Sequence, residues 1–448
     1  MKRPNILILM SDEHRADVAG YEGNTVVKTP TLDWLAETGV QFRNAYTPSP
    51  ICVPARQCMA SGQLPRTCGA ERYGQDLKSG HMTFARLFSQ YAYLSIAFGK
   101  LHHQGYDQMH GWRRRIGMDD MQMVEGNLEG RNEEAFAAFP KDPSRKWTDS
   151  KEVLRAGVGR SPYSDWDDYA TLGFEYFCRE SLVSPYYDKD LNARPKLLYV
   201  GLNNPHYPYF TDEKKFEYYL PRVRPFEDQK PFDHPFLGNC PNDKKPLVMG
   251  KDLSEREIRR AMAAYYGNIE SNDDRYRRIL DALTLAGENL DDWLIIYTSD
   301  HGEMLGEHCL WEKQKFFEAS VRVPLIVRWP ARFAGGRTVH ENANLCDLFA
   351  TFCDAAGLPV PPGLDSRSLL PLLEGNTASW DNESVSQFGG KNIMIKRDNL
   401  KYHSYGNDMP EVLFDLVKNP GETVNFADDP GYAPVMKLFR ARRKELGF

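Results

Sequence analysis

Residues 5–14 read Asn5-Ile6-Leu7-Ile8-Leu9-Met10-Ser11-Asp12-Glu13-His14, a short apolar run that passes directly into two acids and a histidine. A run of this length and composition is typical of a strand buried on both faces of a parallel sheet. Ligands of open α/β sheets bind outside the carboxyl ends of the strands. The opening of the chain therefore predicts a buried strand with a binding site at its end.

The same pattern recurs further along the chain. The apolar stretches 197–201 and 294–298 pass into Asn203-Asn204-Pro205-His206 and Ser299-Asp300-His301-Gly302, and 324–327 is also strand-like. Amphipathic helices are expected between them: 31–39, capped by Thr31, and 254–286, where Ser254 and Glu257 have capping-box spacing. The alternation predicts the α/β class, with a large mixed, mostly parallel sheet flanked by helices.

The character of the sequence changes near residue 335. Residues 342–356 predict a helix, and 432–446 predict a basic helix that closes the chain. Three alternating stretches between them predict antiparallel strands: 392–396, 401–405 and 412–415. We expect a catalytic α/β domain at 1–360 and a small α+β domain carrying an antiparallel sheet at 361–448. Residues 111–195, rich in Arg, Asp, Trp and Tyr, predict insertions over one face of the sheet, where substrate is selected.

Composition narrows the function. The 448 residues are 41% hydrophobic and 26% charged, the balance of a globular protein. With 56 basic and 62 acidic residues the net charge is -6, which argues against a nucleic-acid partner, and no run approaches the ~18 apolar residues of a membrane span. The first apolar run is too short for a signal peptide, so a cytoplasmic location is expected. The eight scattered cysteines indicate neither a disulfide framework nor a cysteine zinc site. A homo-oligomer stays open.

The strand-end acids predict a metal site. Asp12, Glu13 and Asp300 offer hard oxygen ligands that suit Ca²⁺ or Mg²⁺, and His301 is placed either to ligate as well or to bond substrate. Acids after a strand also cap helices, which is the alternative for any one of them alone. Acid clusters at two strand ends, one with a histidine, favour the metal.

A second group of residues surrounds Cys52. Pro54 suits the first turn of a helix, which places Cys52 just ahead of the helix N-terminus and Arg56 one turn further on. A thiol there is acidified beside an anion site, and we expect it to face solvent. The alternative is a buried small hydrophobe. A cysteine-based phosphatase is excluded, because it needs five residues between Cys and Arg and this chain has three.

Cys52-x-Pro54-Ala55-Arg56 resembles the signature of the formylglycine-dependent sulfatases, in the alkaline-phosphatase-like superfamily. Other elements that resemble this family, in chain order, are Lys28-Thr29-Pro30, Gly62-Gln63-Leu64-Pro65, Gly99-Lys100-Leu101-His102, Pro205-His206, Ser299-Asp300-His301-Gly302, Leu310-Trp311-Glu312-Lys313 and Leu413-Phe414-Asp415-Leu416. The stretch Asp107-Gln108-Met109-His110-Gly111 is similar to the choline-sulfatase-like branch.

The resemblance implies a mechanism. A formylglycine-generating or anaerobic sulfatase-maturing enzyme oxidises Cys52 to formylglycine, which is hydrated on a divalent ion, usually Ca²⁺, with Mg²⁺ and Mn²⁺ as alternatives. One hydroxyl of the hydrate attacks sulfur and the other expels sulfate. Asp12, Asp300 and His301 resemble the metal residues. Glu13 stands where the family often has Asp, so it is either a shifted ligand or an outer residue.

The remaining site residues follow from the same resemblance. Arg56 and Lys100 steady the hydrated aldehyde, and His102 takes a proton as it collapses. His206 and Lys313 bind sulfate oxygens, and one of them protonates the leaving oxygen. Asn204 either touches substrate or closes its turn.

The sequence therefore predicts a sulfuric ester hydrolase that acts on a small sulfated metabolite or sugar. One alternative is a phosphonate monoester or phosphodiester hydrolase of the same superfamily. Another is a choline sulfatase, although Arg72-Tyr73-Gly74 replaces an asparagine of that branch. A non-catalytic binding protein is the third, and the intact set of site residues argues against it.

Overall fold

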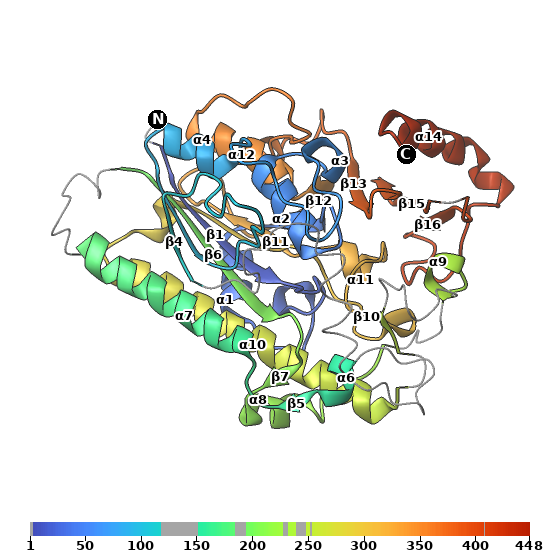
Figure 1. Ribbon diagram of the computed structural model, residues 1–448, viewed down its shortest axis with the longest axis horizontal. Helices are drawn as coiled ribbons and strands as arrows, with labels where there is room; N and C mark the ends of the chain where they lie inside the picture. The colour runs from blue at the N-terminus through green and yellow to red at the C-terminus, as the bar shows by residue number, and fades with distance from the viewer. Residues whose placement is uncertain are drawn as a thin grey trace.

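The computed structural model describes residues 3–117, 151–183, 194–226, 232–238, 248–250, 253–406 and 408–448. Its centre is an eight-stranded sheet in the order β12-β2-β11-β9-β1-β6-β3-β4 (Figure 1). The strands are β1 (Asn5–Asp12), β2 (Val40–Tyr46), β3 (Leu94–Gly99), β4 (Arg114–Ile116), β6 (Lys196–Pro205), β9 (Trp293–Ser299), β11 (Leu325–Arg328) and β12 (Arg337–Asn344). β11 pairs antiparallel with β2 and β9, and the other pairings are parallel, which confirms the predicted mixed, mostly parallel sheet.

β1 occupies the middle of this sheet, between β6 and β9. Ile6, Ile8 and Met10 pack into the core on one face, and Leu7 and Leu9 pack into the core on the other. Burial of such a side chain contributes about 1.5–3 kcal/mol. The apolar run that opens the chain is therefore held from both sides, which fixes the position of the acids that follow it.

Helices cover both faces. The layer that includes Leu7 and Leu9 contains α1 (Pro30–Thr38), α7 (Pro162–Phe177) and α10 (Glu255–Leu285), and α7 and α10 run side by side (Figure 1). The opposite layer contains α2 (Cys52–Ser61), α4 (Phe84–Gln90) and α12 (Asp347–Ala356). The capping box of Ser254 and Glu257 at the start of α10 is present as predicted.

Three expectations need correction. Helix α7 lies within 111–195, but it packs on β6 and β3 as part of the core; its buried stripe includes the polar Asp167 and Thr171, which weaken the apolar period. The expected helix at 342–356 begins only at Asp347, because the preceding residues complete β12. Helix α1 is not capped by the Thr31 side chain: the Asp273 carboxylate of α10 accepts the backbone N–H of Thr31 and Leu32 at 2.9–3.1 Å.

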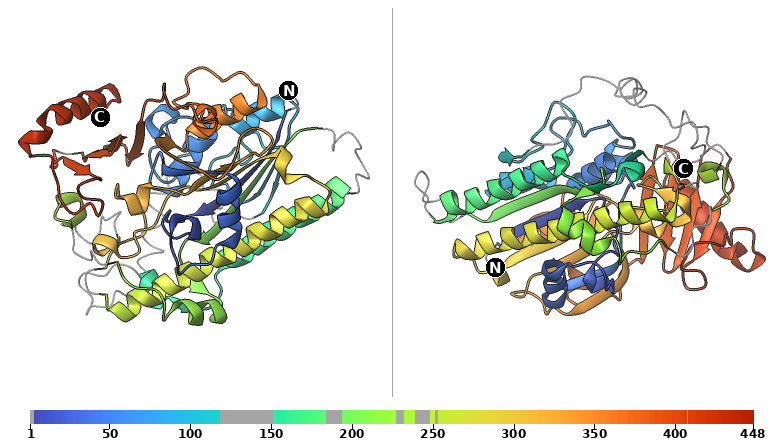
Figure 2. Two further views of the ribbon diagram at one scale, coloured as in Figure 1. Left: turned by 180° about the vertical axis from the view of Figure 1, so that it is seen from behind. Right: turned by 90° about the horizontal axis from the view of Figure 1, so that it is seen from below.

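The C-terminal part carries the predicted antiparallel sheet, which lies at one end of the molecule together with α14 (Ala433–Glu445) (Figure 2). Its strands are β13 (Glu383–Phe388), β14 (Asn392–Arg397), β15 (Leu400–Ser404) and β16 (Val412–Asp415). Tyr402 of this sheet stacks on Phe439 of α14 with ring centroids 5.4 Å apart. The division at residue 360 stays a prediction.

The remaining α-helices and strands are short. They are α3 (Pro65–Cys68), α6 (Lys151–Arg155), α8 (Glu213–Tyr219), α9 (Pro235–Gly238), α11 (Glu318–Val321), α13 (Leu370–Leu373), β5 (Gly157–Val158), β7 (Phe210–Thr211), β8 (Val248–Met249) and β10 (Leu310–Trp311). None of the helices in the described ranges combines the length and apolarity that a bilayer crossing requires.

Candidate active site

The predicted site residues meet at one edge of the large sheet. Asp12 ends β1, and Lys100, His206 and Asp300 directly follow β3, β6 and β9. These four strands are parallel neighbours, so their carboxyl ends lie together. All four side chains are buried. Residues that are far apart in the sequence therefore lie together at this edge of the sheet.

Asp12, Asp300 and His301 form a candidate metal centre. One ligand atom from each lies within 4.8 Å of the others, and His301 Nε2 is 3.9 Å from Asp12 Oδ1 and 3.8 Å from Asp300 Oδ1. Among the described residues, Asp12 Oδ1 and His301 Nε2 have no hydrogen-bond partner, although both are fully buried. Unpaired buried polar atoms are costly, and a cation between them would satisfy both. Two carboxylates and one imidazole fit a divalent ion.

Arg56 holds the opposite side of these carboxylates. Its Nε donates to Asp300 Oδ2 at 2.7 Å and its Nη2 donates to Asp12 Oδ2 at 3.0 Å. Its Nη1 donates to the Lys100 carbonyl at 3.0 Å and to the Tyr199 hydroxyl at 2.8 Å. Burial opposes ionisation of Asp12, but Lys100, then other nearby cationic groups, outweigh it and hold its pKa well below the ordinary value. Arg56 thus leaves Asp12 Oδ1 turned toward the candidate metal position.

Glu13 lies beside the metal centre and contacts Lys313. Lys313 Nζ donates to Glu13 Oε2 at 2.8 Å, and the Glu13 backbone N–H donates to Asp300 Oδ1 at 3.0 Å. Burial, assisted by neighbouring carboxylates, raises the pKa of Glu13 against the pull of Lys313. One Glu13 oxygen also lies within 4.8 Å of ligand atoms of Asp12 and His206. Whether Glu13 ligates a metal stays a prediction.

Cys52 is the first residue of α2, so the helix begins slightly earlier than the sequence predicts. It is only 3% exposed, so the expectation of a solvent-facing thiol is wrong: the side chain lies beneath the site, within 4.8 Å of an Asp12 oxygen and a His102 ring nitrogen. Burial alone would raise the pKa of the thiol, but His102 and His301 lower it to about 6. The position combines an acidified group with a helix N-terminus, where negative charge is favoured.

Cationic groups line the rest of the site. Lys100 Nζ is 3.1 Å from Asp12 Oδ2. Lys313 Nζ donates to His206 Nε2 at 2.6 Å, and His206 Nδ1 donates to the Tyr207 carbonyl at 2.6 Å. Burial, and then Lys313, hold the pKa of His206 well below its ordinary value, so Lys313 carries the proton of this pair. The arrangement can bind an anion and deliver a proton to it.

Asn204 is buried near the end of β6 and contacts residues of α7. Its backbone N–H donates to Asp167 Oδ2 at 2.9 Å, and Nδ2 contacts Ser164 Oγ at 3.4 Å. These contacts fit the turn-closing alternative, and a contact with substrate stays a prediction. Sequence reasoning missed Asp167 and Tyr199. The one signal that could have identified them is that both face inward, Asp167 on α7 and Tyr199 on β6. The spacing of apolar residues in these two segments does not predict which polar groups they contact.

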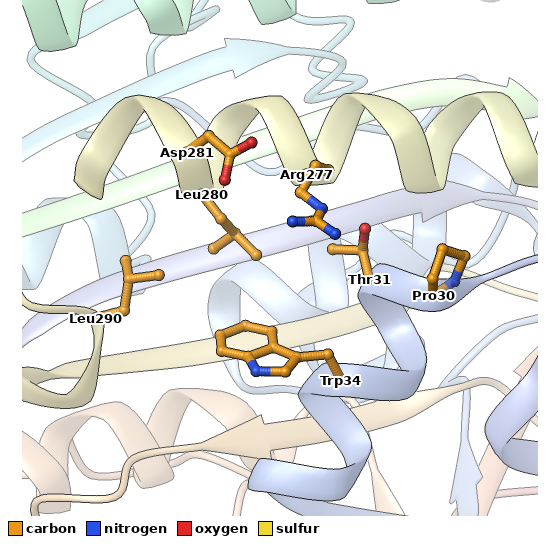
Figure 3. Close-up of a pocket in the computed structure, with 7 residues that line it drawn as sticks. All are labelled: Pro30, Thr31, Trp34, Arg277, Leu280, Asp281 and Leu290. Atoms are coloured by element: carbon orange, nitrogen blue, oxygen red, sulfur yellow. The ribbon is translucent and has the colours of Figure 1, made fainter. Parts of the chain in front are cut away.

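Three aromatic rings border the cationic groups. Tyr73 lies edge-on to His102 at 5.9 Å, and Tyr163 lies edge-on to His206 at 5.5 Å. Lys313 Nζ lies 4.3 Å from the centre of the Tyr207 ring. A separate cavity of about 200 Å³ opens between α1 and α10, where Trp34 and Arg277 line it (Figure 3); it contains none of the predicted site residues.

Comparisons with known proteins identify the family of the chain. A model of the sulfatase family matches residues 4–358, and a model of the N-sulphoglucosamine sulphohydrolase C-terminal region matches residues 306–447. The choline-sulfatase of Rhizobium meliloti is 30% identical over 447 residues, which cover 96% of this chain and 83% of that protein. The N-acetylglucosamine-6-O-sulfatase of Bacteroides thetaiotaomicron is 25% identical over 97% of this chain and 85% of that protein.

Solved structures share the fold. The phosphonate monoester hydrolase of Agrobacterium radiobacter superposes with a TM-score of 0.77 at 24% identity, covering 99% of this chain and 95% of that one. A protein bound to its substrate D-glucosamine-2-N,6-O-disulfate gives a TM-score of 0.77 at 20% identity, covering 99% and 97%. At these identities the two structures bear on the fold alone. Together, the family match over most of the chain and its full-length relatives establish that the chain belongs to the sulfatase family and is a sulfuric ester hydrolase.

Proposed function

We propose that this enzyme removes sulfate from a small sulfated metabolite or sugar, with formylglycine derived from Cys52 as the nucleophile on a divalent ion. The observation that carries the proposal is the position of Cys52. The residue begins α2 within 4.8 Å of Asp12 and His102, beside the Asp12, Asp300 and His301 group. Cys52 packs beside Tyr46 and Ile51 in a buried cluster, but packing alone does not require a thiol acidified by His102 and His301 beside candidate metal-ligand oxygens.

The proposed reaction needs a divalent ion and the formylglycine form of residue 52. A divalent ion, which we take to be Ca²⁺ because the donors are mostly oxygen, would be held by Asp12, Asp300 and His301 and would supply positive charge for the bound ester. Formylglycine would supply two hydroxyls on one carbon when hydrated, one to accept the sulfuryl group and one to release it. Conversion of CH₂SH to CHO exchanges sulfur for oxygen and removes two hydrogens. A maturing enzyme must therefore supply the oxidant.

The chain's own residues then have distinct tasks. Arg56 and Lys100 hold the Asp12 side of the site and keep its charge balanced. His102, next to Cys52, is placed to take a proton from residue 52. Lys313 is protonated and lies between Glu13 and His206. It can therefore bind a sulfate oxygen and supply the proton that the leaving oxygen needs.

Aromatic side chains that border the site indicate the class of substrate. Tyr73, Tyr163 and Tyr207 place rings beside His102, His206 and Lys313. Such rings suit the apolar face of a sugar, and relatives over nearly the whole chain include an N-acetylglucosamine-6-O-sulfatase. Choline sulfate is the second candidate, because the same rings also attract a quaternary ammonium and one relative is a choline-sulfatase. A phosphonate monoester is the third, on the likeness of fold alone.

The test is kinetic and uses matured enzyme. Paired aryl sulfate and aryl phosphonate esters with the same leaving group are compared first, and kcat/KM for the sulfate is expected to exceed that for the phosphonate by orders of magnitude. Sulfated mono- and disaccharides are then compared with choline sulfate. A preference for the phosphonate would contradict the assigned reaction, and a preference for choline sulfate would contradict the sugar. Cys52→Ala provides the background rate. The cytoplasmic location stays a prediction.

A further inference from the structure

A second group of metal-ligand side chains lies outside the site described above. Asp76, His103 and His110 each offer one atom within 4.8 Å of the others. His103 and His110 lie on the segment that follows His102, and their rings are 4.4 Å apart between centroids. His103 and His110 are 2% and 1% exposed, and the Asp76 side chain is 7% exposed.

The distances within this cluster are unusual for hydrogen bonds. His103 Nδ1 is 3.7 Å from Asp76 Oδ1, and His110 Nε2 is 3.5 Å from Asp76 Oδ2. A hydrogen bond from a ring nitrogen to a carboxylate is about 2.7–3.2 Å long. Ligands placed ~2.1 Å from a tetrahedral zinc are separated by about 3.4 Å, the edge of the tetrahedron. The two observed separations, one to each Asp76 oxygen, are slightly longer than that edge.

His110 supplies the second observation. Neither of its ring nitrogens has a hydrogen-bond partner in the described part of the chain, although the residue is 1% exposed. Its Nε2 faces Asp76, and its Nδ1 is 3.8 Å from Asp107 Oδ2. A histidine that ligates a metal through one nitrogen commonly presents the other to a carboxylate. Asp107 lies on that side of the ring, beyond hydrogen-bond distance at 3.8 Å, and accepts from Arg86 at 2.8 Å.

The surroundings fix the cluster in place. Asp76 Oδ2 accepts the backbone N–H groups of Gln104 and Gly105 at 2.9 and 2.6 Å. Gln57 Nε2 lies 3.1 Å from His103 Nδ1, a contact that an ion bound through this nitrogen would replace. Because one carboxylate and two imidazoles are borderline rather than hard donors, they favour zinc-class ions over calcium.

We propose that Asp76, His103 and His110 form a second metal site, which binds one zinc-class divalent ion and leaves a fourth position for water. The bound ion ties residue 76 to the segment 103–110 and so fixes the segment that carries His102. The site is distinct from the Asp12, Asp300 and His301 group, and the inference does not depend on the substrate assigned above.

The experiment is a metal titration of the full chain. Cys52→Ala serves as the background, because it removes a thiol that could bind zinc at the catalytic centre. The protein is stripped with chelator, saturated with Ca²⁺, and titrated with Co²⁺, whose visible absorption reports tetrahedral nitrogen and oxygen ligands. Bound zinc is then counted after gel filtration. We expect one equivalent of either ion, with Zn²⁺ displacing Co²⁺.

Variants assign the binding. His110→Gln, which keeps a polar side chain of similar size, should lose the Co²⁺ spectrum, and Asp107→Asn should weaken binding by about 10–100-fold. Asp300→Asn, at the other centre, should leave the spectrum unchanged, as should the buried control His403→Gln. Thermal unfolding in chelator checks that each variant folds. Failure of the Ca²⁺-saturated background protein to bind Co²⁺ or Zn²⁺ would overturn the proposal, as would an unchanged spectrum in folded His110→Gln.

Discussion

Arg56 is the residue on which the charge balance of the site depends most directly. It is 2% exposed, and its guanidinium donates to Asp12, Asp300, the Lys100 carbonyl and the Tyr199 hydroxyl. Removing one partner of a buried ion pair typically costs about 3–5 kcal/mol, because the other charge stays buried without compensation. Arg56→Ala takes from Asp300 the guanidinium that pairs with it, while Asp12 keeps Lys100 at 3.1 Å. We therefore expect a loss of about 3–5 kcal/mol in the free energy of unfolding.

Arg56→Lys separates charge from geometry. The ammonium keeps the positive charge but lacks the planar fork that reaches both carboxylates at once. A hydrogen bond to a charged group contributes about 1.5–3 kcal/mol. Because Arg56→Lys loses one such bond, we expect the free energy of unfolding to fall by about that amount. Both substitutions should lower kcat/KM. A fall of 3–5 kcal/mol in transition-state stabilisation would correspond to about two to nearly four powers of ten.

The assay is urea unfolding at neutral pH in the presence of chelator, so that no ion replaces the lost charge. Arg155→Ala is the control, since Arg155 pairs with Glu152 at 2.6 Å on the surface with its side chain 47% exposed. Such exposed pairs contribute about 0–1 kcal/mol. The reasoning is refuted if Arg56→Ala unfolds within about 1 kcal/mol of the unmodified protein, the range of a surface pair.

Three further predictions concern separate features. Cys52→Ala should fold but lose turnover, and the peptide with residue 52 in matured enzyme should be about 18 Da lighter than the cysteine form by mass spectrometry; more than ~1% of kcat in the variant would contradict the mechanism. Burial, assisted by Lys401, holds the pKa of His403 well below its ordinary value. Below about pH 6.5 the unfolded chain therefore binds more protons than the folded chain, and the free energy of unfolding decreases as the pH is lowered. His403→Phe should make this decrease smaller, as measured by urea unfolding at pH 7 and pH 5. Lys401 is fully buried with Glu318 at 2.8 Å and Glu422 beside it, so Lys401→Met should cost about 3–5 kcal/mol, and changing both glutamates to Gln as well should restore most of it.

The strands and their polar ends could be predicted because each is a local pattern. The apolar run of β1 and the acids after it are adjacent in sequence, and the parallel arrangement brings Asp12 and Asp300 together without further information. Cys52 could be placed at a helix N-terminus for the same reason, from Pro54 two residues later. Its burial could not, because the groups that cover it come from distant parts of the chain.

The supporting residues escaped prediction for a physical reason. Asp167 lies on the buried stripe of α7 and accepts the backbone N–H groups of Asn203 and Asn204 at 2.6 and 2.9 Å. A buried acid in an apolar stripe lowers the helical signal that would have revealed α7. Tyr199 likewise reads as one more apolar residue of β6 until its hydroxyl is seen to accept from Arg56. Polar partners of buried charges are fixed by tertiary contacts, which leave no periodic trace in the sequence.

The same contacts explain how the site can attract a sulfate ester. Asp12 uses Oδ2 for Arg56 and Lys100, so its negative charge is already paired while Oδ1 stays turned toward His301. Asp300 is likewise paired with Arg56 through Oδ2. A divalent ion bound at the remaining atoms would therefore add positive charge that these side chains do not cancel. A sulfate monoester carries one negative charge and neutralises part of it. The remainder, together with the proton on Lys313, would stabilise the negative charge that develops as the ester bond breaks.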